Sequence, residues 1–347
     1  MTPSSPGAPR LVSVCLLGFG NAARRWCEIT DERAQELAQR HGVEFRVTAV
    51  GTARHGSLLR PAGLSPGQVL SLVRDGDGSF PEPVRPGVEL VSRSGADVLV
   101  EATVLEPGGH AAIAHLEAAF ANGMDAVTVN KGPIAWAYRR VRGAADRAGR
   151  RLRFEGVTMD GCPVYNLVEL CLPGSTVLGF HGVLNSTTNF VLDAMVGGSD
   201  LESAVRTAQR AGFAEADPSD DIDGRDAAAK VAALANVLMD ADITPDDVPH
   251  ESIRGVTPEQ TAAVTSKGAR LRVRCSAERG PDGAVTAGVA LVEVGPDHPY
   301  YDVTGSSSLL VLETDLMGDV EIVERDGQIT QTAYAIYADL LTLYARR

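Results

Sequence analysis

Short apolar runs alternate with helical patterns through the first half of the chain. The runs cover residues 11–17, 45–50, 96–103 and 125–130, and the helical patterns cover residues 111–122 and 134–148. Strands that alternate with helices are typical of a parallel sheet that helices cover on both faces. The pattern therefore predicts a doubly wound α/β domain over residues 1–150.

A glycine-rich turn follows the first predicted strand at once. It leads directly into a helical pattern, which is the order of a Rossmann-type dinucleotide-binding turn. Gly18 would permit the tight turn, Gly20 would let the backbone approach a pyrophosphate, and Ala23 would lie where helix meets strand. The helix N-terminus would hold the phosphates. The predicted cofactor contacts in this turn are Gly18, Phe19, Gly20, Asn21 and Ala22.

Three further residues are predicted to contact the cofactor. The second predicted strand ends in a loop that has Arg54 and lacks the acidic residue that usually holds a free ribose 2′-hydroxyl. An arginine there suits a 2′-phosphate, so NADP is favoured over NAD, unless Arg54 is an ordinary solvated loop residue. Thr103 and Lys131 come at the ends of two later strands, where ligands bind in open parallel sheets.

The pattern changes at about residue 151 to strands with longer helices between them. The predicted strands cover residues 151–157, 177–184, 271–276 and 285–294. We expect a second domain over residues 151–330, of α+β type, with a mixed sheet that helices cover on one face. A final helix within residues 331–347 is expected to pack back on the first domain, and residues 1–10 are expected to form a frayed tail.

Lysine is rare in this chain, and two of the three lysines lie in apolar surroundings. The chain has 32 basic residues, of which only Lys131, Lys230 and Lys267 are lysine. Lys131 ends an apolar run, and Lys230 lies inside the apolar stretch 227–236. Arginine stays charged in proteins, whereas a desolvated lysine can exchange a proton near neutral pH. The pattern indicates a proton-handling role, with chance survival of two lysines in an arginine-rich chain as the alternative.

The densest polar run of the chain leads into Lys230. Asp223 is a predicted N-cap for a helix that starts at Gly224. Asp226 and Lys230 then lie four residues apart on one helical face, in the favourable order for an ion pair, and their apolar neighbours predict a buried rim. There the carboxylate can orient the amine and tune its pKa. A divalent-metal loop is disfavoured, because the spacing of the carboxylates does not match the Asp-x-Asp-x-Asp-Gly calcium loop.

A second polar segment, residues 185–189, has the sequence Asn-Ser-Thr-Thr-Asn and follows a predicted strand. Its short hydroxyl and amide side chains can form a hydrogen-bonding rim at the end of the strand. They can equally cap a helix that begins near Phe190, and the two interpretations are compatible.

The bulk composition favours a small-molecule partner. The formal charge is −13 over 347 residues, with no block of basic residues, which argues against nucleic acid or an anionic membrane as the partner. No uncharged apolar run is long enough to span a bilayer. The five cysteines are scattered without a Cys-x-x-Cys pair, which is typical of the reduced cytoplasm and predicts neither disulfides nor a thiolate metal site.

These motifs together resemble the homoserine dehydrogenases of the short kind, which lack a C-terminal regulatory domain. The segments that carry the resemblance run in order through nearly the whole chain: residues 18–20, 128–133, 154–155, 161–163, 185–189, 215–218, 221–230, 297–299 and 332–333. The acidic run that ends in Lys230 is the most specific of them. The resemblance implies a reversible, NAD(P)-dependent reduction of aspartate 4-semialdehyde to homoserine, on the path to threonine and methionine.

The resemblance also implies roles for individual residues. Lys230 matches the acid/base, Asp226 the carboxylate that supports it, and Lys131 a second lysine beside substrate and nicotinamide. Glu215 matches the group that binds the substrate ammonium, and Asp221 and Thr187 fall in the substrate shell. A monovalent cation is implied at the segment of Glu155, Thr158, Asp160 and Cys162, and a homodimer through the second-domain sheet.

Two departures from the family pattern affect the substrate end. Residues 324–328, Glu-Arg-Asp-Gly-Gln, stand where the family usually has a Gly-x-Gly-Ala-Gly loop, and Phe213 stands where a substrate-facing tyrosine is usual. Side chains at the first place would occupy space that bare backbone leaves open. A related enzyme that keeps the lysine chemistry but reduces another small aldehyde or ketone is therefore the alternative function.

Overall fold

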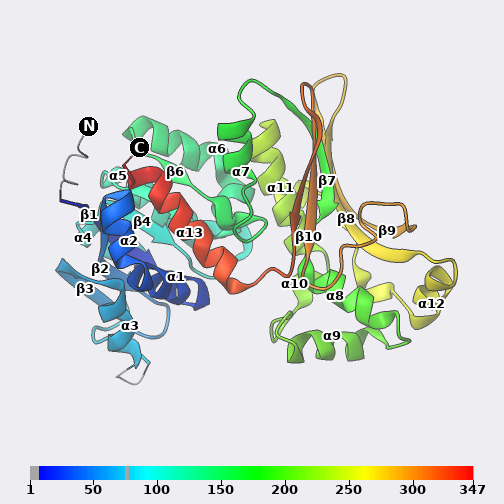
Figure 1. The fold of residues 1–347 in the computed structure, drawn as a ribbon, viewed down its shortest axis with the longest axis horizontal. Helices are drawn as coiled ribbons and strands as arrows, with labels where there is room; N and C mark the ends of the chain where they lie inside the picture. The colour runs from blue at the N-terminus through cyan, green and yellow to red at the C-terminus, as the bar shows by residue number, and fades with distance from the viewer. Residues whose placement is uncertain (1–7, 75–77, 347) are drawn as a thin grey trace, which may run out of the picture. The chain divides into compact units, whose positions relative to one another are not determined.

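The structure, a computed structural model, describes residues 8–74 and 78–346 (Figure 1). Residues 1–7 of the expected tail lie outside the described part. The chain divides into two compact units. The first comprises Met1–Pro133, Arg139–Gly161 and Gln328–Arg347, and the second comprises Ile134–Tyr138 and Cys162–Gly327.

The first unit is built on a six-stranded sheet of the described residues, in the order β3-β2-β1-β4-β5-β6. Neighbouring strands are parallel except for β2 and β3, which are antiparallel. The elements are β1 (Arg10–Leu17), α1 (Asn21–Glu32), α2 (Ala34–Glu36), β2 (Val43–Gly51), β3 (Ser57–Leu64), α3 (Pro66–Arg74), α4 (Gly87–Arg93), β4 (Val98–Glu101), α5 (His110–Ala121), β5 (Asp125–Thr128), α6 (Lys131–Ala148), β6 (Leu152–Arg153) and α13 (Ile329–Tyr344). Of α6, residues 134–138 belong to the second unit.

Apolar residues on both faces of this sheet explain why helices cover both. Val12, Val14 and Leu16 of β1 pack into a core with residues of α1 and α13. The side chain of Leu17 in β1 does not join this core but packs beside Leu90 of α4, next to Gly51. Since successive strand residues point to opposite faces, α4 covers the face away from α1 and α13. The predicted Rossmann-type fold is confirmed, and ligands of such a sheet bind beyond the carboxyl ends of its strands.

The helix α13 packs in the first unit although it comes last in the chain. Its buried residues Ala333, Ile336, Leu340 and Leu343 join the α1 side of the core. The hydroxyl of Tyr344 donates to Asp125 Oδ2 at 2.8 Å and thereby ties the helix to the start of β5.

The structure corrects the interpretation of residues 151–157, which were predicted as a strand of the second sheet. Only β6 is a strand there; it pairs in parallel with β5 in the first sheet, and a 3-10 turn at Glu155–Val157 follows. The apolar residues of this segment do not keep the period of two that a longer strand requires. The first unit accordingly continues to Gly161. The edge strand β3 was not predicted, because its Pro61 and Gly63 are untypical of strands.

The second unit holds a five-stranded sheet of the described residues, in the order β11-β10-β7-β8-β9. All neighbouring strands are antiparallel, which corrects the expected mixed sheet. The elements are α7 (Tyr165–Cys171), β7 (Val177–Val183), α8 (Ser186–Met195), α9 (Leu201–Arg210), α10 (Ser219–Ile222), α11 (Arg225–Met239), α12 (Pro258–Ser266), β8 (Arg270–Arg279), β9 (Val285–Val294), β10 (Ser308–Thr314) and β11 (Gly318–Glu324).

The helix α11 lies across β7, β8 and β9 of this sheet. Its alanine-rich side, which includes Ala228, Val231 and Ala232, is fully buried. A separate apolar cluster packs Tyr300 and Val303 against strand residues that include Val183 and Val311. The strands β10 and β11 were not predicted, because a short apolar run alone does not distinguish a strand from a buried helix.

None of the described helices is both long enough and apolar enough to cross a lipid bilayer.

Candidate active site

The glycine turn of the first unit is shaped by the end of β4. Gly18 has φ +87°, a conformation that side chains disfavour, and its N–H donates to Gly51 O at 2.9 Å. A Cβ added at Gly18 would lie 2.1 Å from Ala102 O, so only glycine fits. At Gly20 a Cβ would meet no atom of the described residues within 4 Å, which leaves open space in front of the backbone.

The start of α1 suits an anion. Gly20 is its N-cap residue, no side chain of the described residues caps it, and Asn21 and Ala22 begin a first turn without acidic residues. Free N–H groups and the helix dipole attract phosphate at such a terminus. The ring of Phe19 packs on Phe80 with centroids 5.1 Å apart, so Phe19 can offer a ligand its backbone but not its ring. The turn therefore fits a dinucleotide.

Arg54 lies in a tight turn after β2. The hydroxyl of Thr52 donates to Gly56 O at 2.8 Å and accepts from His55 N–H at 2.8 Å, which closes the turn. Arg54 is exposed at its tip and forms no ion pair with another described residue. Its guanidinium is thus available to a ligand.

Lys131 opens α6 and is only partly exposed. The Asn130 side chain caps this helix, since its Oδ1 accepts from Gly132 N–H at 2.9 Å. Gly109 packs so closely on Gly132 that a Cβ on Gly109 would lie 2.7 Å from the Gly132 carbonyl carbon. The backbone after Lys131 is therefore held from two sides.

Thr103 lies in the loop after β4 and accepts at its carbonyl oxygen from Asn130 Nδ2 at 3.1 Å. The next residue, Val104, is 91% exposed. An exposed apolar side chain at the carboxyl ends of parallel strands can pack on a ligand. Val104 was not predicted from the sequence, because an exposed residue in a loop is not part of any periodic pattern.

The second unit brings Lys230 and Asp226 together as predicted from their spacing. Lys230 Nζ donates to Leu184 O at 2.6 Å and lies 3.6 Å from Asp226 Oδ2. The two side chains are 15% and 16% exposed. The ammonium is thus largely withdrawn from water yet reachable, which is the setting of a group that exchanges a proton with a ligand.

Asn185 links this pair to a second carboxylate. Its Nδ2 donates to Asp221 Oδ1 at 2.7 Å and to Asp226 Oδ2 at 3.0 Å. Its Oδ1 accepts from Thr188 N–H at 2.8 Å and so caps α8. The amide therefore serves as a helix cap and as part of a polar rim, the two interpretations that the sequence had left open, although the helix begins at Ser186 and not near Phe190 as predicted.

Burial raises the pKa of the Asp221 carboxyl, and the neighbouring carboxylate of Asp226 raises it further. The hydrogen bond from Asn185 and the charge of Lys230 oppose these effects. Two carboxylates and one ammonium thus lie close together in a largely desolvated place. A carboxyl group whose pKa is shifted by burial and by a neighbouring charge is typical of catalytic sites.

Three comparisons with known proteins bear on these sites. The family model described as homoserine dehydrogenase matches residues 163–341, and that described as homoserine dehydrogenase, NAD binding domain, matches residues 18–155. The NAD(+)-dependent homoserine dehydrogenase of Pseudomonas canavaninivorans is 31% identical over 95% of this chain and 96% of that protein. The homoserine dehydrogenase of Methanocaldococcus jannaschii is 31% identical over 96% of this chain and 98% of that protein.

The chain belongs to the homoserine dehydrogenase family. Among solved structures, a putative homoserine dehydrogenase of Archaeoglobus fulgidus superposes with a TM-score of 0.86 at 28% identity. That match covers 96% of this chain and all of the other.

The remaining substrate residues expected from the homoserine dehydrogenase pattern lie around α8 and α10. Thr187 is buried, and its hydroxyl donates to Phe213 O at 2.9 Å. Phe213 packs on Phe190 with ring centroids 4.8 Å apart. Glu215 is exposed, and its backbone carbonyl accepts from Gln209 Nε2 at 3.1 Å. The Glu215 carboxylate therefore stays open to a ligand.

The predicted N-cap of α11 is wrong by one residue. Gly224, at φ +83°, is the N-cap residue, and α11 begins at Arg225. The carboxylate of Asp223 is instead engaged by the guanidinium of Arg254, with Arg254 Nη2 at 3.0 Å from Asp223 Oδ2. A partner 31 residues away outcompetes the local cap, which sequence spacing could not reveal.

Cys275 of β8 was missed as a neighbour of the lysine site. It is fully buried, and burial raises the pKa of its thiol to about 12, while the charge of Lys230 lowers it. The thiol is therefore protonated and contributes packing near the ammonium. Its place on a strand next to α11 leaves no motif in the sequence.

The segment expected to hold a cation in homoserine dehydrogenases has one suitable feature. The hydroxyl of Thr158 is buried without a hydrogen-bond partner in the described part of the chain. Glu155 is buried, and its N–H donates to Asp339 Oδ2 at 3.0 Å. Asp160, at φ +45°, accepts from the Thr332 hydroxyl at 2.9 Å. Cys162 is the first residue of the longer segment of the second unit and is partly exposed. The described residues hold no cluster of three or more His, Cys, Asp or Glu side chains that suits a metal ion.

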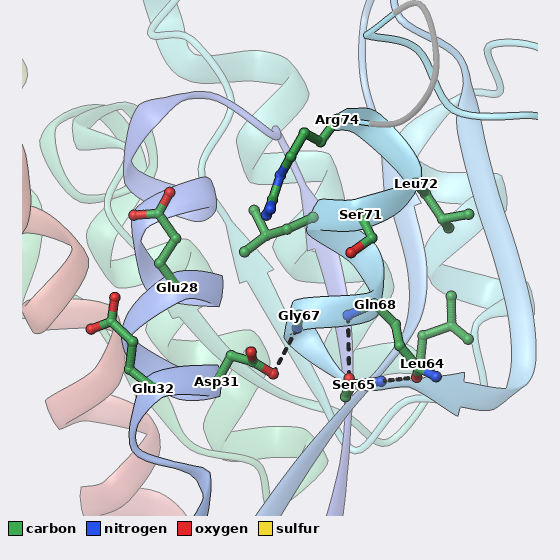
Figure 2. Close-up of a pocket in the computed structure, with 11 residues that line it drawn as sticks. Glu28, Asp31, Glu32, Leu64, Ser65, Gly67, Gln68, Ser71, Leu72 and Arg74 are labelled. Carbon is green, nitrogen blue, oxygen red and sulfur yellow. Dashed lines mark hydrogen bonds between the residues drawn. The ribbon is translucent and has the colours of Figure 1, made fainter.

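A surface hollow of about 980 Å³ lies between α1 and α3 (Figure 2). None of the predicted site residues lines it. Asp31 accepts from Gly67 N–H at 3.2 Å there, and Glu28 and Glu32 add negative charge. Carboxylates would repel dinucleotide phosphates, so this hollow is unsuited to the cofactor.

Proposed function

We propose that this chain catalyses the reversible, NAD(P)-dependent reduction of aspartate 4-semialdehyde to L-homoserine. The observation that carries the proposal is the Lys230 ammonium, fixed between Leu184 O at 2.6 Å and Asp226 Oδ2 at 3.6 Å and largely withdrawn from water. The two relatives described above are homoserine dehydrogenases, which supports the same reaction.

The side chains act on the substrate oxygen. Reduction of an aldehyde leaves an alkoxide, which Lys230 protonates through Nζ; in the reverse direction Lys230 accepts that proton from the alcohol. Asp226 and the Leu184 carbonyl orient the ammonium. Lys131 polarises the carbonyl as a second cation. A bound nicotinamide would supply the hydride for reduction and accept it for oxidation.

The substrate's other groups are assigned to the second unit. Glu215 receives the substrate ammonium, since its carboxylate is exposed in the loop before α10. Asp221 and Thr187 complete the substrate shell, and the hydrogen bond from Thr187 to Phe213 O fixes that loop. Orientation of this kind lowers the barrier by holding the reacting atoms in place.

The test is a steady-state assay of NADPH oxidation with aspartate 4-semialdehyde, and of NADP+ reduction with L-homoserine. We expect turnover in both directions. NADPH binding without turnover would reject the proposal.

One observation favours the alternative, a related enzyme for another small carbonyl compound. Glu324 is 5% exposed and pairs with Ser308, next to the register position where Leu309 pairs with Val183. Glu324 therefore lies at the same end of the sheet as Leu184, whose carbonyl oxygen accepts from Lys230. A carboxylate there changes the polarity of the place where the substrate is expected to bind. Turnover of a panel of small aldehydes and ketones, faster than of aspartate 4-semialdehyde, would favour this alternative.

We propose NADP as the preferred cofactor, because Arg54 is exposed after β2 and suits a 2′-phosphate. The Pseudomonas canavaninivorans relative is named NAD(+)-dependent, so the choice needs a test on this chain. Arg54→Gln is expected to raise the KM for NADPH by roughly tenfold, the effect of losing one charged hydrogen bond, and to leave the KM for NADH within about twofold. A matched control is Arg60→Gln, whose guanidinium is 2.8 Å from Glu82 Oε1. Equal effects on both cofactors would contradict the prediction.

We also propose a monovalent cation at the segment of Glu155, Thr158, Asp160 and Cys162, held largely by backbone carbonyls. The buried Thr158 hydroxyl supports it. A higher unfolding temperature in KCl or NaCl than in choline chloride of equal ionic strength tests this proposal; equal temperatures reject it.

A homodimer through the second-unit sheet and a cytoplasmic location complete the proposal. The five cysteines are scattered in the sequence without a Cys-x-x-Cys pair, which suits a reducing compartment. Sedimentation equilibrium tests the dimer, and a purely monomeric species would reject it. Fractionation of the native cells tests the location.

A further inference from the structure

A buried carboxylate lies at the end of β4, and the proposed reaction does not use it directly. Glu101 is the last residue of β4 and is 0% exposed. A buried carboxylate without partners is costly, so its partners show what it holds in place.

The two carboxylate oxygens bind three different segments. Oε1 accepts from the hydroxyl of Thr103 and, at 3.4 Å, from its backbone N–H. Oε2 accepts from the Thr128 hydroxyl at 3.4 Å. His115 Nδ1, on α5, lies 3.4 Å from Oε1. Glu101 thus joins three segments: Thr103 in the loop after β4, Thr128 at the end of β5 and His115 in α5.

The same network continues to the residues beside Lys131. Asn130 N–H donates to the Thr128 hydroxyl oxygen at 3.0 Å, and Asn130 Nδ2 donates to Thr103 O at 3.1 Å and to Thr103 Oγ1 at 3.3 Å. Val129 N–H donates to Glu101 O at 3.1 Å. Asn130 then caps α6 through the N–H of Gly132.

Only two residues, Val129 and Asn130, connect β5 with Lys131. Val129 is tied to the backbone carbonyl of Glu101, whereas Asn130 is tied to the Glu101 carboxylate through the Thr128 hydroxyl. The direction in which Lys131 leaves the backbone depends on this short connection. A displacement of about 1 Å at a reacting group can cost a hundredfold in rate. Glu101 itself has no exposed surface with which to touch a ligand.

We propose that Glu101 is a positioning residue for Lys131, acting through Thr128, Thr103 and Asn130. The inference rests on the proposed function, in which Lys131 polarises the substrate carbonyl. The carboxylate accepts hydrogen bonds on both oxygens at once, which neither a neutral amide nor an apolar side chain can do.

A double-mutant cycle with Lys131 tests the proposal. Glu101→Gln keeps the shape but replaces one acceptor oxygen with a donor. In the otherwise unchanged protein, Glu101→Gln is expected to lower kcat on the order of tenfold, with the Kd for NADPH changed less than about threefold. In the Lys131→Ala background the same change is expected to lower the residual kcat less than about twofold, because the group that Glu101 positions is gone.

A second measurement needs neither cofactor nor turnover. Hydrogen exchange of the backbone amides of Asn130 and Gly132 is expected to be on the order of tenfold faster in Glu101→Gln, because their acceptors, the Thr128 hydroxyl and Asn130 Oδ1, are loosened. The matched control is Asp125→Asn at the other end of β5, whose carboxylate accepts from Arg151 N–H at 2.9 Å and from the Tyr344 hydroxyl at 2.8 Å. It is expected to leave both kcat and this exchange within about twofold.

Unchanged kcat and unchanged exchange in Glu101→Gln would overturn the proposal, and so would an equal loss of kcat in both backgrounds. If Glu101→Gln does not fold, Thr128→Val takes the same two tests, because it removes the link between Glu101 and Asn130 at nearly constant volume. If the unaltered protein shows no turnover with aspartate 4-semialdehyde, the proposed function fails, while the exchange measurement still decides whether Glu101 holds the connection to Lys131.

Discussion

Replacing Lys230 with methionine is expected to lower kcat by a factor of roughly 10² to 10⁴, the usual contribution of a positioned acid/base. Methionine keeps most of the apolar stem of this α11 side chain and loses the ammonium that protonates the alkoxide. The hydrogen bond to Leu184 O and the contact with Asp226 are lost at the same time. Steady-state kinetics in both directions measure the effect, and circular dichroism reports whether the fold is kept.

The chain offers a matched control in its third lysine. Lys267 follows α12, its side chain is 63% exposed, and it pairs with Glu293 on the surface at 3.1 Å. Lys267→Met is expected to leave kcat within about twofold, since exposed pairs of this kind contribute little. If the Lys230→Met protein folds and turns over at the rate of the Lys267→Met protein, Lys230 is not the acid/base of the reaction.

Gly18→Ala is expected to destabilise the fold and to abolish measurable cofactor binding. The backbone at φ +87° costs a side chain about 1 to 2 kcal/mol, and the overlap with Ala102 O, 2.1 Å from the added Cβ, costs about 1 to 3 kcal/mol more. The turn can accept the methyl group only by moving away from β4. Denaturant unfolding measures the stability, and NADPH fluorescence titration measures the binding.

Gly20→Ala separates the two effects. Its Cβ would meet no described atom within 4 Å, and the residue has φ −81°, so stability is expected to change by less than about 1 kcal/mol. Affinity for NADPH is nevertheless expected to fall by roughly tenfold or more, because the methyl group takes the space that the pyrophosphate would use. Unchanged affinity in Gly20→Ala would contradict the assignment of this turn to the cofactor.

Local patterns in the sequence were sufficient for two parts of this protein. The order of strand, glycine turn and helix around Gly18 predicted the nucleotide-binding fold, because backbone conformation and helix start are properties of neighbouring residues. The spacing of Asp226 and Lys230 predicted their contact, because residues four apart share a helical face. Both features are encoded within a few residues of the chain.

Only the tertiary structure decided the partners that come from elsewhere in the chain. Leu184 O, which accepts from Lys230, lies 46 residues away in sequence, and Asp223 binds Arg254 rather than the start of α11. The Glu101 network joins three segments, none of which carries a motif for it. Periodicity specifies which face of an element is apolar, but the partner of a polar group depends on which strands and helices pack together, and that is settled by long-range burial.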